Sequence, residues 1–292
     1  MKKLFFAIFL INGLLFAQPK VLIVNAHPDD ESGCAATVYK ITQELGGTVE
    51  LAVVTNGEAG YKYSILAEKL YGQPLTKEAV GRQYLPKIRK KELKAGCKWV
   101  GINKIHFYDQ LDTHYTLDAD TVLTQVWNVN TVKQSLRQLI EKNHYDYIFC
   151  LLPTEQTHGH HKAATILALE TVKALPENLR PTILGVSVSS KTDTTEAKFT
   201  GLVKYPITAI QMGKPDFQLD RNASFGFKNR LNYKIVVNWL IAEHKSQGTM
   251  QTFMGSGDTE HFWFFDVNAK ERREKTVKFF EQLANSRPKS LN

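Results

Sequence analysis

The 292-residue sequence contains few cysteines, and their spacing excludes two kinds of small scaffold. There are three, Cys34, Cys97 and Cys150, an odd number with no C-x-x-C pair among them. This pattern predicts neither a disulfide framework nor a structural zinc set. Cys97 lies in a helix-like pattern and Cys150 in the apolar run YDYIFCLL, so we expect both to be buried as small apolar residues.

A glycine fingerprint is also missing. No G-x-G-x-x-G follows the first apolar run of the predicted core, which argues against a nucleotide-binding oxidoreductase. Charge of one sign is not concentrated either, because the 37 basic and 29 acidic residues, net +8, are interspersed along the chain. That distribution, without a recognisable nucleic-acid motif, predicts a solvated, weakly basic surface and no nucleic-acid partner.

The first residues have the layout of a leader. Two lysines precede an apolar stretch over residues 4–16, and Ala17 and the polar Gln18 follow it. This predicts a secretory signal peptide over residues 1–17, and the stretch is too short for a membrane span, which needs about 20 residues. We therefore expect an exported protein, periplasmic or secreted, with no stable membrane anchor and with residues 18–292 as a single domain. The alternative is a buried N-terminal helix or an uncleaved anchor.

Short apolar runs rich in β-branched residues alternate with longer segments of helical periodicity. The runs cover residues 20–26, 48–56, 104–109, 145–152 and 181–190, and the helical segments cover 32–45, 86–100, 128–143 and 160–174. Continuous apolar runs are typical of parallel strands covered on both faces. The order predicts an α/β fold, a Rossmann-like three-layer sandwich with a mostly parallel sheet, whose ligands bind at the carboxyl ends of the strands.

Two parts of the chain are less regular. Residues 57–85 lack strong periodicity and are rich in glycine, which predicts a long loop or lid over the site. In the C-terminal extension we expect an added strand over 201–210, a helix over 228–247 and a strand over 260–267.

Three consecutive acidic residues, Asp29, Asp30 and Glu31, follow the first predicted strand. Like charges so close together repel one another, so the cluster indicates a nearby positive species. Pro28 cannot continue a strand ladder, and the acids therefore lie in the connection to the next helix. His27 and Asp30 are three residues apart, a spacing that brings both side chains toward one point.

A second cluster, HGHH, follows the fourth predicted strand. If Gly159 begins the next helix, His158 and His161 lie three residues apart on a similar face. If the first and fourth strands are neighbours, both clusters meet at one edge of the sheet. Two histidines and a carboxylate with a position left for water form a common catalytic zinc set, and iron(II) suits the same ligands. The alternative to a metal site treats each residue alone: His27 would then be a hydrogen-bonded polar residue, and Asp29 and Asp30 would be helix N-caps.

These motifs resemble those of the LmbE-like, or PIG-L, family of metal-dependent de-N-acetylases. The matching segments, in family order, are AHPDDE (26–31), TNGEAG (55–60), residues 88–112, HGHH (158–161) and AEHKSQ (242–247). The resemblance covers about residues 21–247.

The resemblance implies a zinc ion held by His27, Asp30 and His161, with water in the open position. It also implies Asp29 as general base, and His158 as the group that stabilises the oxyanion or protonates the leaving amine. The chemistry agrees, because amide hydrolysis at neutral pH needs an activated water and zinc lowers the pKa of a bound water toward about 7.

Substrate contacts are expected at four further positions. Arg89 and Asp112 match family positions that face the substrate, although Arg89 could instead pair with Glu92 on its own helix. Asn56 and Glu58 end the second predicted strand and are candidates for lining the pocket.

The distal motif departs from the family's usual His-Pro-Asp-His, because Gly159 and His160 stand in its middle. The missing aspartate removes an expected partner of His158. We predict an exported zinc hydrolase that removes an N-acetyl group from an amino sugar of the N-acetylglucosamine type or its conjugate, a small-molecule or glycoconjugate substrate. The alternatives are an amidase of the same family acting on a larger acyl or thiol-conjugate substrate, and a carbohydrate-binding protein whose catalysis has decayed.

Overall fold

A computed structural model describes residues 18–193 and 198–289. The signal peptide predicted over residues 1–17 lies outside the described residues and stays a prediction. Within the described ranges, no helix combines the length and the apolar character needed to cross a bilayer.

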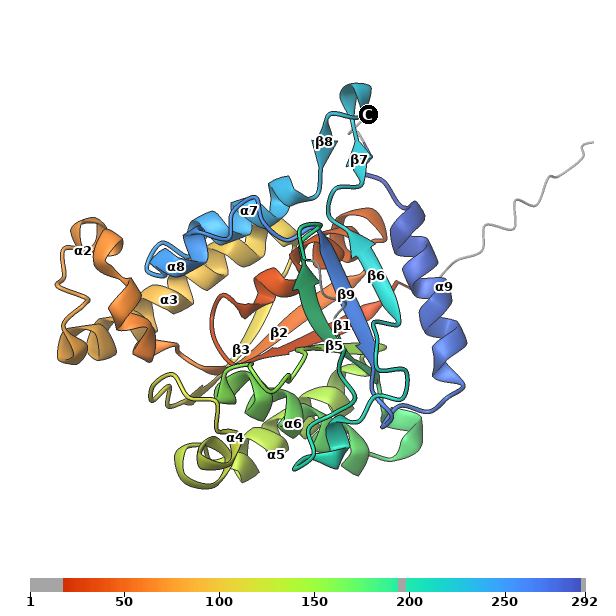
Figure 1. Cartoon of the computed structure of the whole chain (residues 1–292), viewed down its shortest axis with the longest axis horizontal. Helices are drawn as coiled ribbons and strands as arrows, with labels where there is room; N and C mark the ends of the chain where they lie inside the picture. Colours follow the sequence, from red (N-terminus) through yellow and green to blue (C-terminus); the bar gives the residue numbers. More distant parts are fainter. Residues whose placement is uncertain (1–17, 194–197, 290–292) are drawn as a thin grey trace, which may run out of the picture.

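Seven strands form one mixed sheet in the order β3-β2-β1-β4-β5-β9-β6 (Figure 1). Their bounds are β1 Lys20–Asn25, β2 Thr48–Thr55, β3 Lys104–Gln110, β4 Tyr147–Leu151, β5 Thr182–Ser189, β6 Phe217–Asp220 and β9 Thr259–Phe264. Strands β1 to β5 are mutually parallel, and β9 pairs antiparallel with both β5 and β6. The predicted α/β fold with a mostly parallel sheet is confirmed.

Helices cover both faces of the sheet and give three layers (Figure 1). On one face lie α1 Ala35–Tyr39, α3 Glu78–Val100, α7 Lys234–Glu243 and α9 Arg272–Asn285. On the other lie α4 Ala119–Thr121, α5 Val129–Asn143 and α6 Gly159–Ala174. Two short helices, α2 Ile65–Tyr71 and α8 Gly248–Gln251, are neighbours near the outer end of α3, and the hairpin of β7 Ser224–Phe225 and β8 Leu231–Asn232 projects from the body.

Tighter or wider turns extend several of these elements. The 3-10 turns are Asp30–Cys34, Glu58–Tyr63, Glu177–Leu179, Pro206–Thr208 and Phe227–Asn229, and the π-helical turns are Lys40–Glu44 and Val122–Val126. The first of these turns carries the acidic cluster between β1 and α1.

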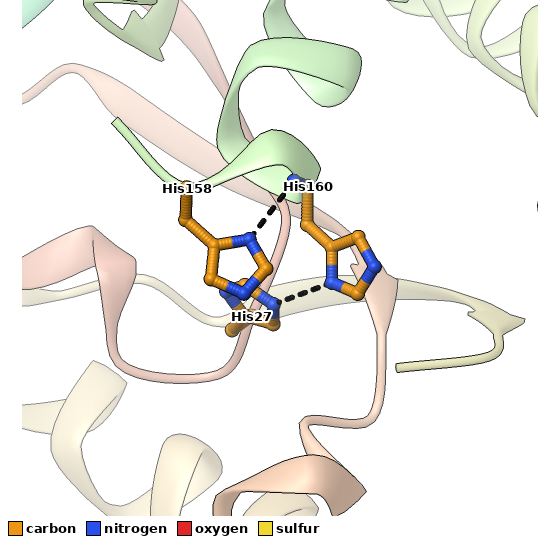
Figure 2. Close-up of side chains that lie close together, drawn as sticks. All are labelled: His27, His158 and His160. Atoms are coloured by element: carbon orange, nitrogen blue, oxygen red, sulfur yellow. Dashed lines mark hydrogen bonds between the residues drawn. The ribbon is translucent and has the colours of Figure 1, made fainter. Parts of the chain in front are cut away.

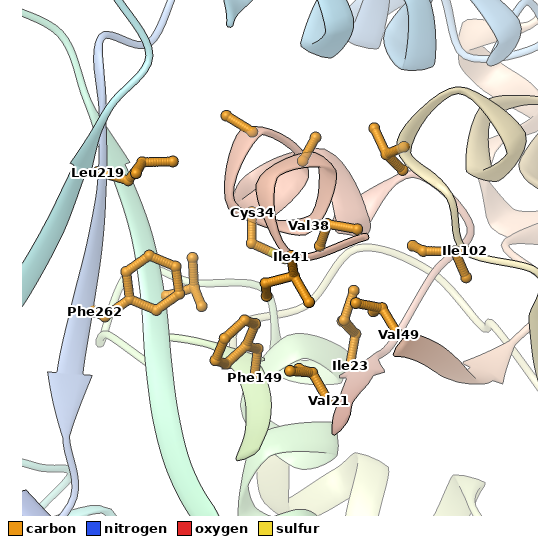
Figure 3. Packing of buried hydrophobic residues seen from close by; sticks show 14 of the residues in the cluster. Val21, Ile23, Cys34, Val38, Ile41, Val49, Ile102, Phe149, Leu219 and Phe262 are labelled. Carbon is orange, nitrogen blue, oxygen red and sulfur yellow. The ribbon is translucent and has the colours of Figure 1, made fainter. Parts of the chain in front are cut away.

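The buried core lies on both faces of the sheet, as the continuous apolar runs predict. Along β1, Val21 and Ile23 pack into the cluster under α1, with Phe149 of β4 beside them (Figure 3). Leu22 and Val24 pack into the cluster under α5 and α6. Successive side chains of a strand point to opposite faces, so a strand buried on both sides has no polar alternation.

The prediction of a long loop over residues 57–85 is wrong. This segment contains the turn Glu58–Tyr63, helix α2 and the first turns of α3, which begins at Glu78 and includes Pro86. Helix α2 leaves Ile65 and Leu66 exposed, and therefore shows no amphipathic period that would reveal it in the sequence.

The C-terminal extension is partly as expected. Strand β9 confirms the strand predicted over 260–267. Residues 201–210 form no strand, because Pro206 lacks a backbone donor and begins a 3-10 turn after an isolated bridge between Leu202 and Tyr205. The helix predicted over 228–247 is shorter, since residues 227–232 belong to the β7–β8 hairpin.

Leu51 provides a test of this core. Its side chain is 0% exposed at the middle of β2, where it lies opposite Ile23 and Ile105 in the two neighbouring strands. We expect Leu51→Ala to lower the free energy of unfolding by about 2–5 kcal/mol in urea titrations, because it leaves a cavity. The matched change Leu66→Ala, at a side chain 78% exposed, should alter it by about 0.5 kcal/mol or less. Equal losses in the two variants would contradict this description of the core.

Candidate functional site

The two clusters singled out in the sequence meet at the carboxyl edge of the sheet. Strand β1 pairs with β4, with Val24 opposite Cys150, so the segments that follow the two strands emerge side by side. Helix α6 begins at Gly159 and His158 is its N-cap residue, as the HGHH pattern predicts.

The side chains of three potential ligands converge there. His27 Nδ1 lies 2.9 Å from His161 Nε2, His161 Nε2 lies 3.1 Å from Asp30 Oδ1, and His27 Nδ1 lies 3.7 Å from Asp30 Oδ2. In a tetrahedral zinc site with bonds of about 2.1 Å, two ligand atoms are separated by roughly 3.4 Å. The donor set and its spacing therefore fit a divalent metal ion such as zinc.

The local backbone holds Asp30 in place. Its Oδ2 accepts the backbone N–H groups of Ala26 and His27 at 3.1 and 2.8 Å, which leaves Oδ1 facing His161. Burial alone would raise the pKa of Asp30, but His161 and His27 hold it well below its usual range. Burial would likewise lower the pKa of His27, yet Asp112, Asp30 and Asp29 together raise it to about 9. The carboxylates thus attract positive charge to this point.

Asp29 is held by a buried arginine. Arg89, 2% exposed, donates from Nη2 to Asp29 Oδ2 at 2.8 Å and to the Pro28 carbonyl at 2.5 Å, and from Nη1 to the Gly57 carbonyl at 2.6 Å. Asp29 has a backbone φ of 136°, a strained value for a residue with a side chain and one often found at functional sites. Burial raises the pKa of Asp29, and Arg89 acts in the opposite direction.

The contacts of Arg89 differ from both roles considered in the sequence analysis. It borders the cavity, but its Nη2 is engaged by the loop that carries Asp29 and its Nη1 by the Gly57 carbonyl, so it acts as a positioning residue for Asp29 rather than as a substrate ligand. The pairing with Glu92 does not form, because that carboxylate accepts from Tyr71 and Ser246.

The third acid of the cluster has its own partner. Glu31 Oε1 lies 2.7 Å from His244 Nε2 with both side chains fully buried, and Glu31 Oε2 accepts the backbone N–H of Asp29. This pairing offsets the free-energy cost of burying the Glu31 carboxylate. His244 belongs to the AEHKSQ segment and lies at the end of α7. The segment is visible in the sequence, but its role is not.

Two histidines of the HGHH motif, His158 and His160, make different hydrogen bonds (Figure 2). His158 Nδ1 accepts the backbone N–H of His160 at 3.0 Å, so the neutral ring of His158 carries its proton on Nε2. Burial, together with His27, His160 and His161, lowers the pKa of His158 to about 3. His158 is therefore a neutral hydrogen-bond donor at the cavity.

His160, which stands where the family usually has aspartate, packs against both a ligand and His158, because its ring centroid lies 5.3 Å from that of His27 and 4.7 Å from that of His158. Its Nδ1 lies 3.1 Å from His27 Nε2 and 3.2 Å from Asp112 Oδ1, and the ring is fully buried (Figure 2). His27, His158 and His160 also bring ligand atoms within 4.8 Å of one another. That group has no carboxylate, whereas the set with Asp30 has the two histidines and the carboxylate of a common catalytic zinc site, so we assign the ion to the set with Asp30.

Of the other predicted substrate contacts, Asp112 lies in the cavity wall, whereas Asn56 and Glu58 lie outside it. Asp112 borders the cavity, where its Oδ2 accepts the backbone N–H of Ala59 and its own N–H donates to Glu58 Oε1. Contrary to the prediction, neither Asn56 nor Glu58 is among the described residues of the wall. Burial raises the pKa of Glu58, whose carboxylate faces the backbone rather than the cavity.

Sequence reasoning missed one buried ion pair at the site. Arg221 Nε donates to Glu260 Oε1 at 2.9 Å, and Arg221 Nη2 donates to the Ser32 carbonyl at 2.6 Å. The Glu260 carboxylate accepts the backbone N–H groups of Ala36 and Thr37 at the start of α1. Strand β9, which contains Glu260, thus anchors the loop that follows the acidic cluster. No local sequence pattern around Arg221 indicates this ion pair.

The three presumed ligands border a cavity of about 410 Å³, together with Asp29, Arg89, Asp112, His158 and Arg221. Its wall also includes six residues not expected from the sequence: Tyr63, Tyr115, Val188, Ile241, Met250 and Phe253. They carry no chemical motif, which is why the sequence does not single them out.

Comparison with known proteins places this site in a family. The model of the GlcNAc-PI de-N-acetylase family (PIG-L) matches residues 22–172, just over half of the chain. The chain therefore belongs to this family of de-N-acetylases, which are hydrolases of carbon–nitrogen bonds. The resemblance seen in the motifs is confirmed.

Two curated relatives carry the same description, probable N-acetyl-alpha-D-glucosaminyl L-malate deacetylase 2. The protein from Bacillus cereus is 26% identical over 172 residues, which are 58% of this chain and 68% of the relative. The protein from Bacillus anthracis is 30% identical over 170 residues, 58% of this chain and 66% of the relative. The alignments thus span about two thirds of each relative's length.

Solved structures share the fold at low identity. An N,N'-diacetylchitobiose deacetylase from Pyrococcus horikoshii has a TM-score of 0.51 at 19% identity, covering 83% of this chain and 82% of its own. GalB, a 4-carboxy-2-hydroxymuconate hydratase from Pseudomonas putida KT2440, has a TM-score of 0.53 at 14% identity, covering 84% and 95%. A hydratase and a deacetylase on one fold mean that the reaction must be argued from the site.

Gly57 provides a test of the Arg89 contacts. It has a φ of +69°, and a Cβ there would lie 1.9 Å from Arg89 Nη1. We expect Gly57→Ala to displace the guanidinium from Asp29 and to lower kcat/KM for amide hydrolysis at least about tenfold, because a misplaced catalytic group is costly.

Gly72 is the matched control. It has a similar φ of +64° but open space around the position of a Cβ. Gly72→Ala should therefore cost about 1 kcal/mol in unfolding free energy from backbone strain and leave kcat/KM unchanged. Equal kinetic effects in the two variants would overturn the positioning role of Arg89.

Proposed function

We propose that this protein is an exported, zinc-dependent deacetylase that removes an N-acetyl group from an amino sugar of the N-acetylglucosamine type or from its conjugate. The observation that carries the proposal is the placement of Asp29 beside the converging His27, Asp30 and His161 atoms at the wall of the cavity. The family and the names of the Bacillus relatives support an amino-sugar amide as substrate. The leader-like pattern of residues 1–17 supports export.

His27 Nδ1, Asp30 Oδ1 and His161 Nε2 would hold the metal ion. When bound there, zinc supplies a water nucleophile at neutral pH and polarises the carbonyl of the scissile amide. Iron(II) would suit the same two histidines and carboxylate.

Asp29 accepts the proton of the attacking water in this proposal. It follows the same strand as the ligands His27 and Asp30 but is oriented by Arg89 instead of joining the ligand set. Arg89 fixes one carboxylate oxygen, so the group is held in one orientation and does not have to be ordered during the reaction. The same carboxyl can then pass the proton to the nitrogen of the leaving amine.

His158 donates to the substrate oxygen. Its neutral ring carries the proton on Nε2, because Nδ1 accepts the N–H of His160. A fixed donor stabilises negative charge that develops on the carbonyl oxygen as water adds, and a site shielded from water strengthens this interaction. Base, donor and ligands all converge, which favours an enzyme over a binding protein whose catalysis has decayed.

The variant Asp29→Asn tests the role of the general base without removing a metal ligand. We expect at least about a hundredfold fall in kcat for acetate release from N-acetylglucosamine derivatives, since general base catalysis contributes about 10²–10⁴-fold. The zinc content of the purified variant, measured by atomic emission, should match that of the wild type. His161→Ala serves as the control that loses both zinc and activity. Undiminished turnover in Asp29→Asn would rule out the assignment of the base.

His160 can be tested through metal binding alone. Its contact with His27 Nε2 orients the ligand ring, and loss of such a partner typically weakens metal binding about 10–100-fold. We expect that loss for His160→Ala in equilibrium competition between the protein and a zinc-chelating dye. The exposed His144, which ends α5 with a φ of 52°, provides a control as His144→Asn, because asparagine tolerates that conformation. Unchanged zinc affinity in His160→Ala would refute the contact's role.

A further inference from the structure

The cavity has two unlike parts. Its inner part is formed by the ligand set, Asp29 and His158, and is polar. The rest of its wall, called the outer wall here, is mostly apolar and comes from separate segments: Tyr63 after β2, Val188 at the end of β5, and Ile241, Met250 and Phe253 from α7 and the residues around α8. The polar residues Gln247, Thr249 and Ser256 lie among them. A group attached to the reacting amide therefore passes from polar surroundings into apolar ones.

The aromatic side chains of the outer wall expose apolar surface to water. Phe253 is 56% exposed and Tyr63 is 47% exposed, although both border the cavity. Surface of this kind at the mouth of a polar site gains free energy when an apolar group covers it, roughly in proportion to the area removed from water.

The two arginines of the described wall are buried and already have partners inside the protein. Among the described residues of the wall, the side chains that are permanently cationic are Arg89 and Arg221, which are 2% and 4% exposed. Arg89 is held by Asp29 and two carbonyl groups, and Arg221 by Glu260 and the Ser32 carbonyl.

The described wall contains no lysine, and a carboxylate in the substrate would have to compete with these partners for two arginines that are almost fully buried. Burying an unpaired charge is strongly unfavourable. A dicarboxylate such as malate is therefore a poor match to the outer part of the cavity.

We propose that the substrate carries an uncharged alkyl or aryl group next to the amino sugar, and that this group lies against Met250 and Phe253. The inference rests on the proposed hydrolysis of an amino-sugar amide and deepens it by naming the substrate class. The apolar group has two sources, an apolar aglycone on the sugar or an N-acyl chain longer than acetyl, and both share the chemistry that the wall recognises.

A substrate panel separates these sources. Zinc-loaded enzyme would be assayed on the methyl, octyl and malyl glycosides of N-acetylglucosamine, and on the methyl glycoside of N-octanoylglucosamine. We expect kcat/KM at least about tenfold higher for an octyl-bearing substrate than for the methyl N-acetyl glycoside, mainly through a lower KM, and the malyl glycoside to be the poorest. A gain with the octyl glycoside assigns the wall to the aglycone, and a gain with the N-octanoyl substrate assigns it to the acyl group. Preference for the malyl glycoside, or equal values for methyl and octyl substrates, would overturn the inference.

A binding measurement tests the apolar wall independently of the proposed reaction. Calorimetric titration of the full-length Asp29→Asn variant with the same compounds measures affinity without turnover. If no compound is hydrolysed by the wild type, the deacetylase proposal fails. Tighter binding of an octyl compound than of the methyl glycoside would still support the apolar wall, and equal binding would reject it.

Two phenylalanines give a matched pair of variants. Phe253→Ser should reduce the octyl-to-methyl ratio of kcat/KM about tenfold, and Phe253→Leu should restore most of it, because leucine keeps the apolar surface. Phe227, 76% exposed in the β7–β8 hairpin and not among the residues of the cavity wall, provides the control, and Phe227→Ser should keep the wild-type ratio. A wild-type ratio in Phe253→Ser would contradict the assignment of this wall.

Discussion

The site depends on the compensation of three neighbouring negative charges at the end of β1. Each acid faces a different partner: Asp29 pairs with Arg89, Asp30 with His161, and Glu31 with His244. The partners come from α3, α6 and the end of α7, so elements on both faces of the sheet must pack correctly before the acids are neutralised. Because a buried charge without a partner is costly, this requirement couples the arrangement of the helices to the chemistry of the loop.

The division of labour among the acids follows from these partners. The carboxylate that two backbone N–H groups hold has one oxygen left to face a metal ion, and the carboxylate held by arginine is kept outside the ligand set. The fully buried Glu31 binds the backbone N–H of Asp29 and thereby stabilises the unusual φ of that residue. Identical or similar side chains thus acquire separate roles from their surroundings alone.

Much of this arrangement follows from local sequence, and the rest does not. Strands β1 to β5, their parallel order and the start of α6 at Gly159 follow from apolar runs and turn residues that act over a few positions. The partner of Glu31 lies 213 residues further along the chain, and such a pairing leaves no mark on local periodicity. Helix α2 and the apolar wall leave a weak sequence signal for a related reason, because many of their apolar side chains are exposed or border the cavity.

The position of β9 has a consequence for the time at which the site forms. This strand lies between β5 and β6 in the sheet, and its Glu260 binds the N-terminal turn of α1 and Arg221. During synthesis the acidic loop emerges long before the residue that anchors it. A nascent chain that already contains every metal ligand therefore still lacks the clamp on its loop, and assembly of the metal site is tied to completion of the sheet rather than to synthesis of the ligands.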